Sequence, residues 1–265
     1  KKVLISKLGA KWISFKDNLP LNEAIAFQTK DTKEYPVVTY SIKMKHGWMW
    51  RIPTQGRWGN GYVFNNKYIN KEEAKKEVEK YLGHKITIGK NIKFEAGALE
   101  KCWISNCLAV GLSASFVEPL EATSIGTTIQ QAFILVHLII NYSNKDIDFY
   151  NKKFNGIIQN IIDFVALHYY YDKDVKLPDS LKENLKKWKN RLPIAEDFDS
   201  KYFLFKESNF SILLKEHNLF NLKNIQKEYM LLNDVLKKVV EDLYQEYKKF
   251  YNTSPKYGHK EFLNK

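Results

Sequence analysis

The chain has 265 residues, a net charge of +12 and 44% hydrophobic residues, which is typical of a folded globular protein rather than a disordered or fibrous one. Only three of its 42 basic residues are arginine, so the charge predicts a lysine-rich solvated surface and no specific nucleic-acid partner. The longest apolar run, residues 132–140, is far shorter than the ~20 residues that a membrane-spanning helix needs, so no membrane partner is expected.

Short β-branched and aromatic runs predict strands in the first 118 residues. These runs lie at residues 37–40, 48–50, 62–64, 86–88, 92–94 and 107–110. One helix interrupts them, because Asn70 and the acidic residues after it form a cap signal and Gly83 is a stop signal.

The two cysteines, Cys102 and Cys107, lie within the last part of this strand-rich region, in an apolar stretch without a second pair or a nearby His. This spacing predicts buried thiols and no metal site. So few cysteines in a chain of this length favour a reducing, cytoplasmic location.

Beyond residue 118 apolar residues recur every three or four positions, which predicts helices. One helical run covers 125–142, a second includes 154–168, a third begins after Pro178, and one long helix covers 225–250. Strands followed by helices predict an α+β fold, with a mainly antiparallel sheet segment followed by a helical C-terminal region. The expected division lies between a sheet-rich part, 1–118, and a helical part, 119–265.

A glycine-rich segment, residues 56–61, lacks the spacing and the following helix of a phosphate-binding loop. Because it lies between aromatic runs, Gly59, Asn60 and Gly61 predict a tight hairpin turn.

The segment from Glu118 to Ser124 joins a loop of small residues to a helix. A helix that begins in this way exposes backbone N–H groups and can bind an anion. The alternative is an ordinary capped helix, in which Glu118 and Glu121 favour the positive end and the hydroxyls of Thr123 and Ser124 help to start it. Spacing alone favours the alternative.

Two indoles, Trp48 and Trp50, fall on one face of a predicted strand, because side chains alternate along a strand. They form either an aromatic pair on the sheet or a flat apolar wall for a ligand.

Three segments together resemble one family, the flavin-dependent halogenases of the tryptophan-halogenase type. Residues 47–53 read Gly-Trp-Met-Trp-Arg-Ile-Pro, residues 59–64 read Gly-Asn-Gly-Tyr-Val-Phe, and residues 111–123 read Gly-Leu-Ser-Ala-Ser-Phe-Val-Glu-Pro-Leu-Glu-Ala-Thr. The first is similar to the family's Trp-x-Trp-x-Ile-Pro signature and the third to its Phe-x-Glu-Pro-Leu-Glu-Ser-Thr segment. The resemblance extends over roughly residues 1–190.

The resemblance implies an FAD-dependent enzyme with a flavin-monooxygenase-like fold, of which this chain is a part. In such enzymes reduced flavin and O2 form a flavin hydroperoxide, chloride or bromide attacks it, and hypohalous acid halogenates an electron-rich, indole-like ring. A separate flavin reductase supplies the reduced flavin. The alternatives are a flavin-dependent aromatic monooxygenase and a non-catalytic remnant or binding module.

The resemblance also implies roles for individual residues. Glu121 is the expected catalytic carboxylate, and the backbone amides of Thr123 and Ser124 are the expected halide site. Tyr169 and Tyr170 match substrate positions. The residues expected at the flavin are Trp48, Trp50, Ile52, Pro53, Gly111, Leu112 and Ser113.

The chain departs from the family in three places. Ala122 and Ser124 replace Ser and Gly beside the expected halide site. Residues 172–178 lack the Phe-Trp pair that holds free tryptophan, so another small aromatic substrate is expected. The Gly-x-Gly-x-x-Gly segment of the flavin domain and the catalytic Lys near it are absent from the 265 residues, so the expected partner is a missing N-terminal half of the fold.

Overall fold

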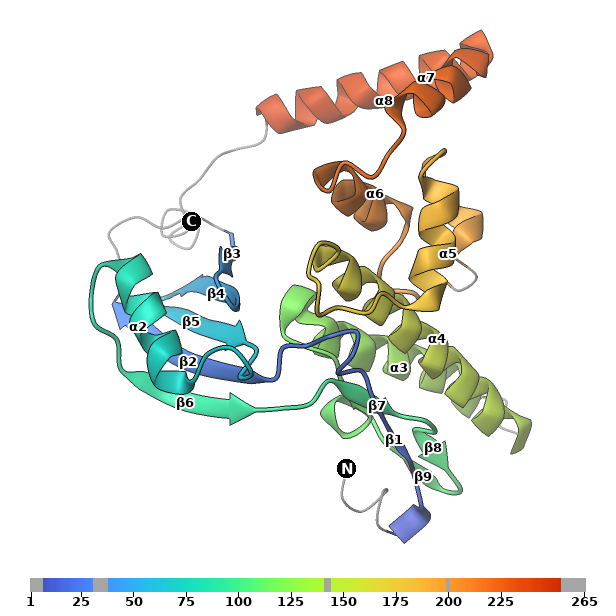
Figure 1. Ribbon diagram of the computed structural model, residues 1–265. Helices are drawn as coiled ribbons and strands as arrows, with labels where there is room; N and C mark the ends of the chain where they lie inside the picture. Colours follow the sequence, from blue (N-terminus) through green and yellow to red (C-terminus); the bar gives the residue numbers. More distant parts are fainter. Residues whose placement is uncertain (1–6, 31–37, 141–143, 199–200, 254–265) are drawn as a thin grey trace. The chain divides into compact units, whose positions relative to one another are not determined.

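The computed structural model describes residues 7–30, 38–140, 144–198 and 201–253 (Figure 1). Its contacts divide the chain into two compact units, each described here by itself. Unit 1 comprises residues 1–20 and 95–228, and unit 2 comprises residues 21–94 and 229–265. The boundary expected at residue 118 lies between the strand-rich and the helical parts of the sequence, and it is not a boundary between these two units. As a domain boundary it stays a prediction.

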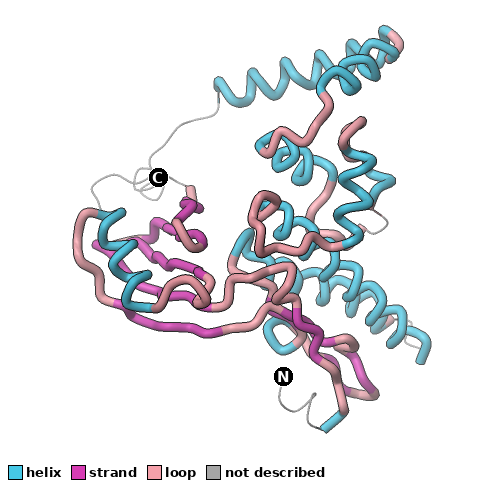
Figure 2. Tube along the Cα trace, in the orientation of Figure 1, coloured by secondary structure: helices cyan, strands magenta, loops and turns pink. Residues whose placement is uncertain are grey.

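Unit 2 is built on a five-stranded antiparallel sheet with the order β3-β4-β5-β2-β6. One face of this sheet is covered by α2 (Lys71–Leu82), and the strands are drawn in magenta in Figure 2. The strands are β2 (Glu23–Lys30), β3 (Tyr40–Met44), β4 (Gly47–Thr54), β5 (Arg57–Phe64) and β6 (Ile88–Lys93).

The ends of α2 confirm the sequence prediction. Asn70 accepts from the backbone N–H groups of Glu72 and Glu73, and Gly83 ends the helix with a left-handed φ of 75°. The helix then buries Ala74 and Val78 in a core with aromatic and aliphatic side chains of the sheet. These are Ile25, Phe27, Met44, Met49, Tyr62 and Phe64.

The hairpin turn predicted at Gly59, Asn60 and Gly61 is wrong. These residues lie inside β5, and the turn before that strand contains Gly56, which has a φ of 79°. A Cβ atom on Gly61 would lie 2.0 Å from the indole of Trp50 on β4. Gly61 is therefore needed for the close approach of a side chain on the neighbouring strand and not for a positive φ.

The strands predicted at 48–50 and 62–64 are confirmed and lie in β4 and β5. Three other runs are confirmed only in part: Tyr40 begins β3, and Ile88 and residues 92–93 lie in β6, whereas residues 38–39, 86–87 and 94 lie outside strands. In unit 1 the run at 107–110 contributes β9 (Cys107–Leu108), which pairs with β8 (Trp103–Ile104). Val37 lies outside the described residues. A small antiparallel sheet joins β1 (Trp12–Ser14), β7 (Gly97–Leu99) and β10 (Ser115–Phe116).

The core of unit 1 surrounds α4 (Asn144–His168), which buries apolar residues over most of its length, including Phe154, Ile157, Ile161, Phe164 and Val165. An aromatic cluster continues the core, with the rings of Phe164 and Phe205 stacked at a centroid distance of 3.8 Å. The other helices are α3 (Thr123–Ile139), α5 (Asp179–Trp188) and α6 (Glu207–Glu216). The helices predicted at 125–142, 154–168 and after Pro178 are thus confirmed, although α3 ends at Ile139 and residues 141–142 lie outside the described residues.

The single long helix predicted over 225–250 is wrong. The structure has two helices, α7 (Leu222–Leu231) and α8 (Asp234–Thr253). The break falls at Asn233, whose side-chain oxygen accepts from the backbone N–H of Leu236 and so starts a new helix. The apolar spacing continues across the break, and therefore gave no sign of it.

One segment among the described residues, Leu120–Ile139, has the length and apolar composition of a membrane-spanning helix, and 28% of it is buried. Core helices of soluble proteins have the same length and composition. The sequence prediction considered only unbroken apolar runs and did not identify this segment.

Candidate functional site

The start of α3 has an unusual backbone. Glu121 and Ala122 both have left-handed conformations, with φ values of 58° and 51°. Two consecutive non-glycine residues in this region store strain on the order of 1–3 kcal/mol each, and such strain concentrates at functional sites. Glu121 is exposed and lies two positions before Thr123, the first residue of the helix.

No side chain caps α3 in the described part of the chain, because Ala122 occupies the N-cap position. The Thr123 hydroxyl instead donates to the backbone oxygen of Glu118 over 3.1 Å. The ordinary capped helix considered from the sequence is therefore not what forms. The positive end of α3 lies beside Glu121 and is suited to an anion.

A buried contact supports this turn from the end of α4. The hydroxyl of Tyr169 donates to a carboxylate oxygen of Glu118 over 2.7 Å, and Glu118 is 1% exposed. Sequence reasoning expected Tyr169 at a substrate and considered Glu118 only as a charge near the helix. The two residues are 51 positions apart, so no local pattern could reveal their contact.

The turn η1 (Gly111–Ser113) is fixed to α3 by Gln131. The Gln131 side chain accepts from the backbone N–H of Gly111 and donates to the oxygen of Ala109, each over 3.0 Å. Gly111 has a φ of 60°, and a Cβ atom there would lie 2.9 Å from the Thr128 hydroxyl. The expected flavin residues Gly111, Leu112 and Ser113 are thus held against the helix that Thr123 and Ser124 begin.

In unit 2, β4 carries the other expected flavin residues. The rings of Trp48 and Trp50 lie on one face, with centroids 6.0 Å apart, as the alternation predicts. Ile52 is partly exposed and Pro53 is buried. The indole N–H of Trp48 is buried and has no hydrogen-bond partner among the described residues. The two ring planes are inclined by 57°, so the pair forms an angled apolar surface and not a flat wall. An apolar surface with an unused donor fits an aromatic ring system that carries acceptor atoms, such as a flavin.

The structure therefore brings Glu121, Thr123, Ser124, η1 and Tyr169 together within unit 1. The ring of Tyr170 lies 5.0 Å from that of Tyr171 and 6.1 Å from that of His217. Trp48, Trp50, Ile52 and Pro53 belong to unit 2. The expected closeness of Glu121 to the two indoles joins both units, and stays a prediction.

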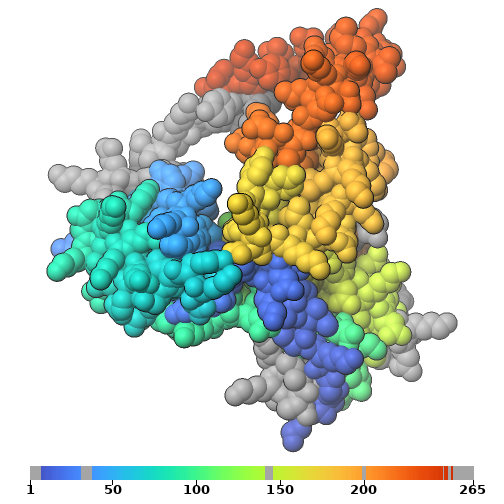
Figure 3. Space-filling view, in the orientation of Figure 1, coloured from blue at the N-terminus to red at the C-terminus, as the bar shows by residue number. Residues whose placement is uncertain are grey.

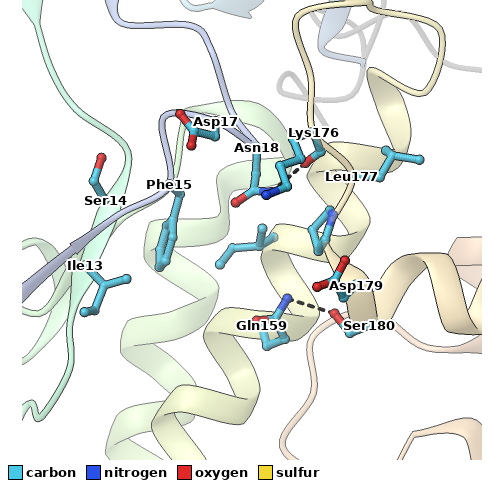
Figure 4. A pocket seen from close by; sticks show the side chains of 12 residues that line it. Ile13, Ser14, Phe15, Asp17, Asn18, Gln159, Lys176, Leu177, Asp179 and Ser180 are labelled. Carbon is cyan, nitrogen blue, oxygen red and sulfur yellow. Dashed lines mark hydrogen bonds between the residues drawn. The ribbon is translucent and has the colours of Figure 1, made fainter.

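A separate pocket of about 500 Å3 lies in unit 1 (Figure 4). In this pocket the Asn18 side chain donates to the backbone oxygen of Lys176. In Figure 3 the N-terminal segment, in blue, accordingly lies against the segment in yellow. Two of the residues that line it, Ser180 and Gln159, donate to Asp163 over 2.7 and 2.8 Å. Burial raises the pKa of Asp163 to about 6, although these hydrogen bonds act in the opposite direction. No sequence pattern indicated this pocket.

Neither cysteine belongs to these sites. Cys102 is buried, and burial raises the pKa of its thiol to about 12, whereas Cys107 is half-buried. Among the described residues, no group of three or more His, Cys, Asp or Glu side chains could hold a metal ion.

Comparison with known proteins gives the family of this chain. The family model for tryptophan halogenase matches residues 1–224. The chain belongs to the tryptophan halogenase family. The match includes all residues expected in the site and ends just after the beginning of α7.

The relatives include a 7-chloro-L-tryptophan 6-halogenase of Kutzneria sp., 32% identical over 73% of this chain and 41% of that protein. A tryptophan 6-halogenase of Streptomyces toxytricini is 31% identical over 74% of this chain and 41% of that protein. A tryptophan halogenase structure from Shewanella frigidimarina superposes with a TM-score of 0.82 at 25% identity, over 94% of this chain and 51% of that chain. This halogenase-family chain thus spans about two-fifths of the length of the curated relatives that it matches.

Proposed function

We propose that this chain supplies the halide-binding and substrate-side portion of a flavin-dependent halogenase, in a partial flavin-monooxygenase-like fold. The observation that carries the proposal is the start of α3, where two consecutive left-handed residues present a carboxylate beside an uncapped helix end. Family membership supports the same reaction class.

In this proposal the backbone N–H groups of Thr123 and Ser124 hold chloride or bromide at the positive end of α3. When bound, reduced FAD and O2, with a separate flavin reductase as the source of electrons, supply the oxidising equivalents that convert the halide into hypohalous acid. Trp48 and Trp50 contribute an apolar surface for the flavin ring.

Glu121 has two tasks. Its carboxylate orients the hypohalous acid by a hydrogen bond, and it accepts the proton that the ring loses when the carbon–halogen bond forms. The ring carbon gains the halogen as the oxygen–halogen bond breaks, and Glu121 passes the ring proton to the departing hydroxide, which leaves as water. The substrate is an electron-rich aromatic ring of the indole class, which Tyr170 flanks; Tyr169 keeps Glu118 and the turn in place.

The test combines the chain with the remaining portion of the fold, reduced FAD, O2 and bromide, and offers indole and free L-tryptophan in parallel. Mass spectrometry should detect a brominated product. Because an amide cannot take the ring proton, Glu121→Gln should lower the rate by about 100-fold or more. Glu183→Gln, an equivalent change at an exposed position of α5, should leave the rate unchanged.

Two outcomes contradict the proposal. A hydroxylated product formed in the presence of bromide would assign the chain to an aromatic monooxygenase. Absence of saturable flavin binding by the assembled protein would identify the chain as a non-catalytic remnant or binding module.

A further inference from the structure

Three consecutive tyrosines, Tyr169, Tyr170 and Tyr171, follow the last residue of α4. The backbone N–H groups of the first two donate to the oxygens of Ala166 and Leu167, so the chain leaves the helix in tight turns. Successive side chains on such a backbone point in different directions, because each residue rotates the chain by about 100–120°. The three rings can therefore reach three different neighbours.

The first tyrosine reaches the turn that carries the expected catalytic carboxylate. The Tyr169 hydroxyl donates to Glu118 over 2.7 Å, and Glu118 lies three positions before Glu121. Tyr170 is the next residue along the chain and is half-buried, so part of its side chain stays accessible to a ligand. A single step along the chain thus connects Tyr170 to a side chain that holds the Glu121 turn.

Tyr170 belongs to a cluster of three rings, which also contains Tyr171 and His217. The rings of Tyr170 and Tyr171 meet edge to face, with centroids 5.0 Å apart and planes inclined by 85°. The His217 ring lies 6.1 Å from that of Tyr170 and 5.5 Å from that of Tyr171. Aromatic rings attract one another at these distances. Two rings packed against that of Tyr170 restrict the rotamers that it can adopt.

A hydrogen bond fastens this cluster to α6. The Tyr171 hydroxyl donates to the backbone oxygen of His217 over 2.6 Å, although the two residues are 46 positions apart. His217 ends α6, where its N–H donates to the oxygen of Leu213. Tyr171 is 68% exposed, so its side chain would have several rotamers available without this bond. The bond therefore fixes the Tyr171 ring against that of Tyr170.

The helix α6 is itself fixed to α4 by core packing. Phe210 of α6 is 1% exposed, and its ring lies 5.3 Å from that of Phe164 on α4. The Asn160 side chain exchanges two hydrogen bonds of 3.0 Å with the backbone of Phe205, just before α6. The end of α6 thus has a defined place relative to the end of α4, and the cluster of three rings is supported from both helices.

We infer that Tyr171 and His217 are positioning residues that decide which carbon of the aromatic substrate is halogenated. The inference rests on the proposed function, in which Tyr170 flanks the substrate. Both residues act through Tyr170, because they hold its ring in one orientation and the substrate ring lies against it. The orientation of the substrate then determines which ring carbon faces the hypohalous acid at Glu121.

The experiment measures the ratio of product isomers, which does not depend on how much of the protein is folded. The assembled protein receives reduced FAD, O2 and bromide with indole or free L-tryptophan, and chromatography with mass spectrometry separates the monobrominated isomers. Tyr171→Phe removes the bond to α6, and His217→Leu removes one ring. Each change should lower the ratio of the main isomer to the second isomer by about fivefold or more.

Two further variants are the controls. His217→Phe keeps a ring in the cluster and leaves the backbone acceptor in place, so it should retain most of the original isomer ratio. Tyr81→Phe removes the hydroxyl of a tyrosine of α2 that is 53% exposed, and should leave the ratio unchanged.

A second measurement uses the chain alone, without flavin, halide or substrate. NMR of tyrosine rings labelled with 13C reports the surroundings of Tyr170, whose signal is assigned by its absence in Tyr170→Phe. His217→Leu should shift this signal, because the imidazole ring near it is lost, whereas Tyr81→Phe should not.

The other outcomes contradict the inference or the function on which it rests. An unchanged isomer ratio in Tyr171→Phe and His217→Leu would overturn the positioning role, even if the yield of product fell. An unshifted Tyr170 signal in His217→Leu would do the same. Absence of any brominated product from the unchanged protein would instead contradict the proposed function, and the positioning role with it.

Discussion

At the scale of single residues, the hydrogen bond between Tyr169 and Glu118 connects α4 to the turn before α3. Tyr169→Phe removes the donor and leaves a buried carboxylate oxygen without it, which should lower the free energy of unfolding by about 1–3 kcal/mol. Tyr170→Phe is the matched control, because no hydrogen bond of its hydroxyl is present among the described residues. Urea titration measures both variants. Equal stability of the two would mean that the bond does not hold the turn.

The raised pKa of Asp163 should make the stability of the protein depend on pH. Its pKa is raised from 3.8 to about 6 by burial, so the folded state binds the proton more tightly than the unfolded state. Stability should therefore fall as the pH rises from about 4 to about 6, by an amount on the order of 3 kcal/mol. Asp163→Asn keeps the size of the side chain and cannot ionise, so its urea midpoint should lose this dependence. A variant that retained the same slope would assign it to another group.

At the scale of elements, the packing of β4 against β5 depends on Gly61, which has no side chain where the Trp50 ring lies. Gly61→Ala places a methyl group 2.0 Å from the Trp50 ring, and should destabilise unit 2 by about 1–3 kcal/mol and shift the indole fluorescence. Gly59→Ala is the matched control on the same strand, because its nearest neighbour, the Ile52 oxygen, is 3.9 Å away. Thermal unfolding of the two variants separates two explanations. Close packing predicts that only Gly61→Ala lowers the unfolding temperature, whereas an effect of strand propensity would change both variants equally.

Local signals in the sequence were sufficient to predict those elements whose formation depends on residues only a few positions apart. The cap at Asn70, the stop at Gly83 and the apolar spacing in α4 were enough to predict α2 and α4. The role of Gly61 depends on a residue of the next strand, which no local pattern contains.

The candidate site divides in the same way. The segment from Glu121 to Ser124 was found through its motif, and its uncapped helix end is a property of the folded backbone. The support from Glu118 and Tyr169 was not found, because it joins positions 51 residues apart. The distance between this segment and Trp48 involves both units, and stays a prediction.

At the scale of the whole molecule, the two units have separate cores. Phe64 is fully buried in unit 2 and Phe154 in unit 1, and each change to Ala should remove about 3–5 kcal/mol from its own unit. Hydrogen exchange with mass spectrometry should show loss of protection in β2, β5 and β6 for Phe64→Ala, and in α4 for Phe154→Ala. Uniform loss across both units in either variant would show that they unfold as one.

The first and last residues of the sheet region of unit 2, Asn22 and Phe94, lie next to each other. The Phe94 N–H donates to the oxygen of Asn22, and the Phe15 N–H donates to that of Ala96, each over 2.9 Å. In the sequence, residues 22–94 are thus a cassette inserted between the two segments of unit 1, and hydrogen bonds join the ends of the cassette. Exchange of this stretch between family members would need no change in the spacing of the flanking strands. During synthesis β1 must wait until the whole cassette has emerged before it can pair with β7.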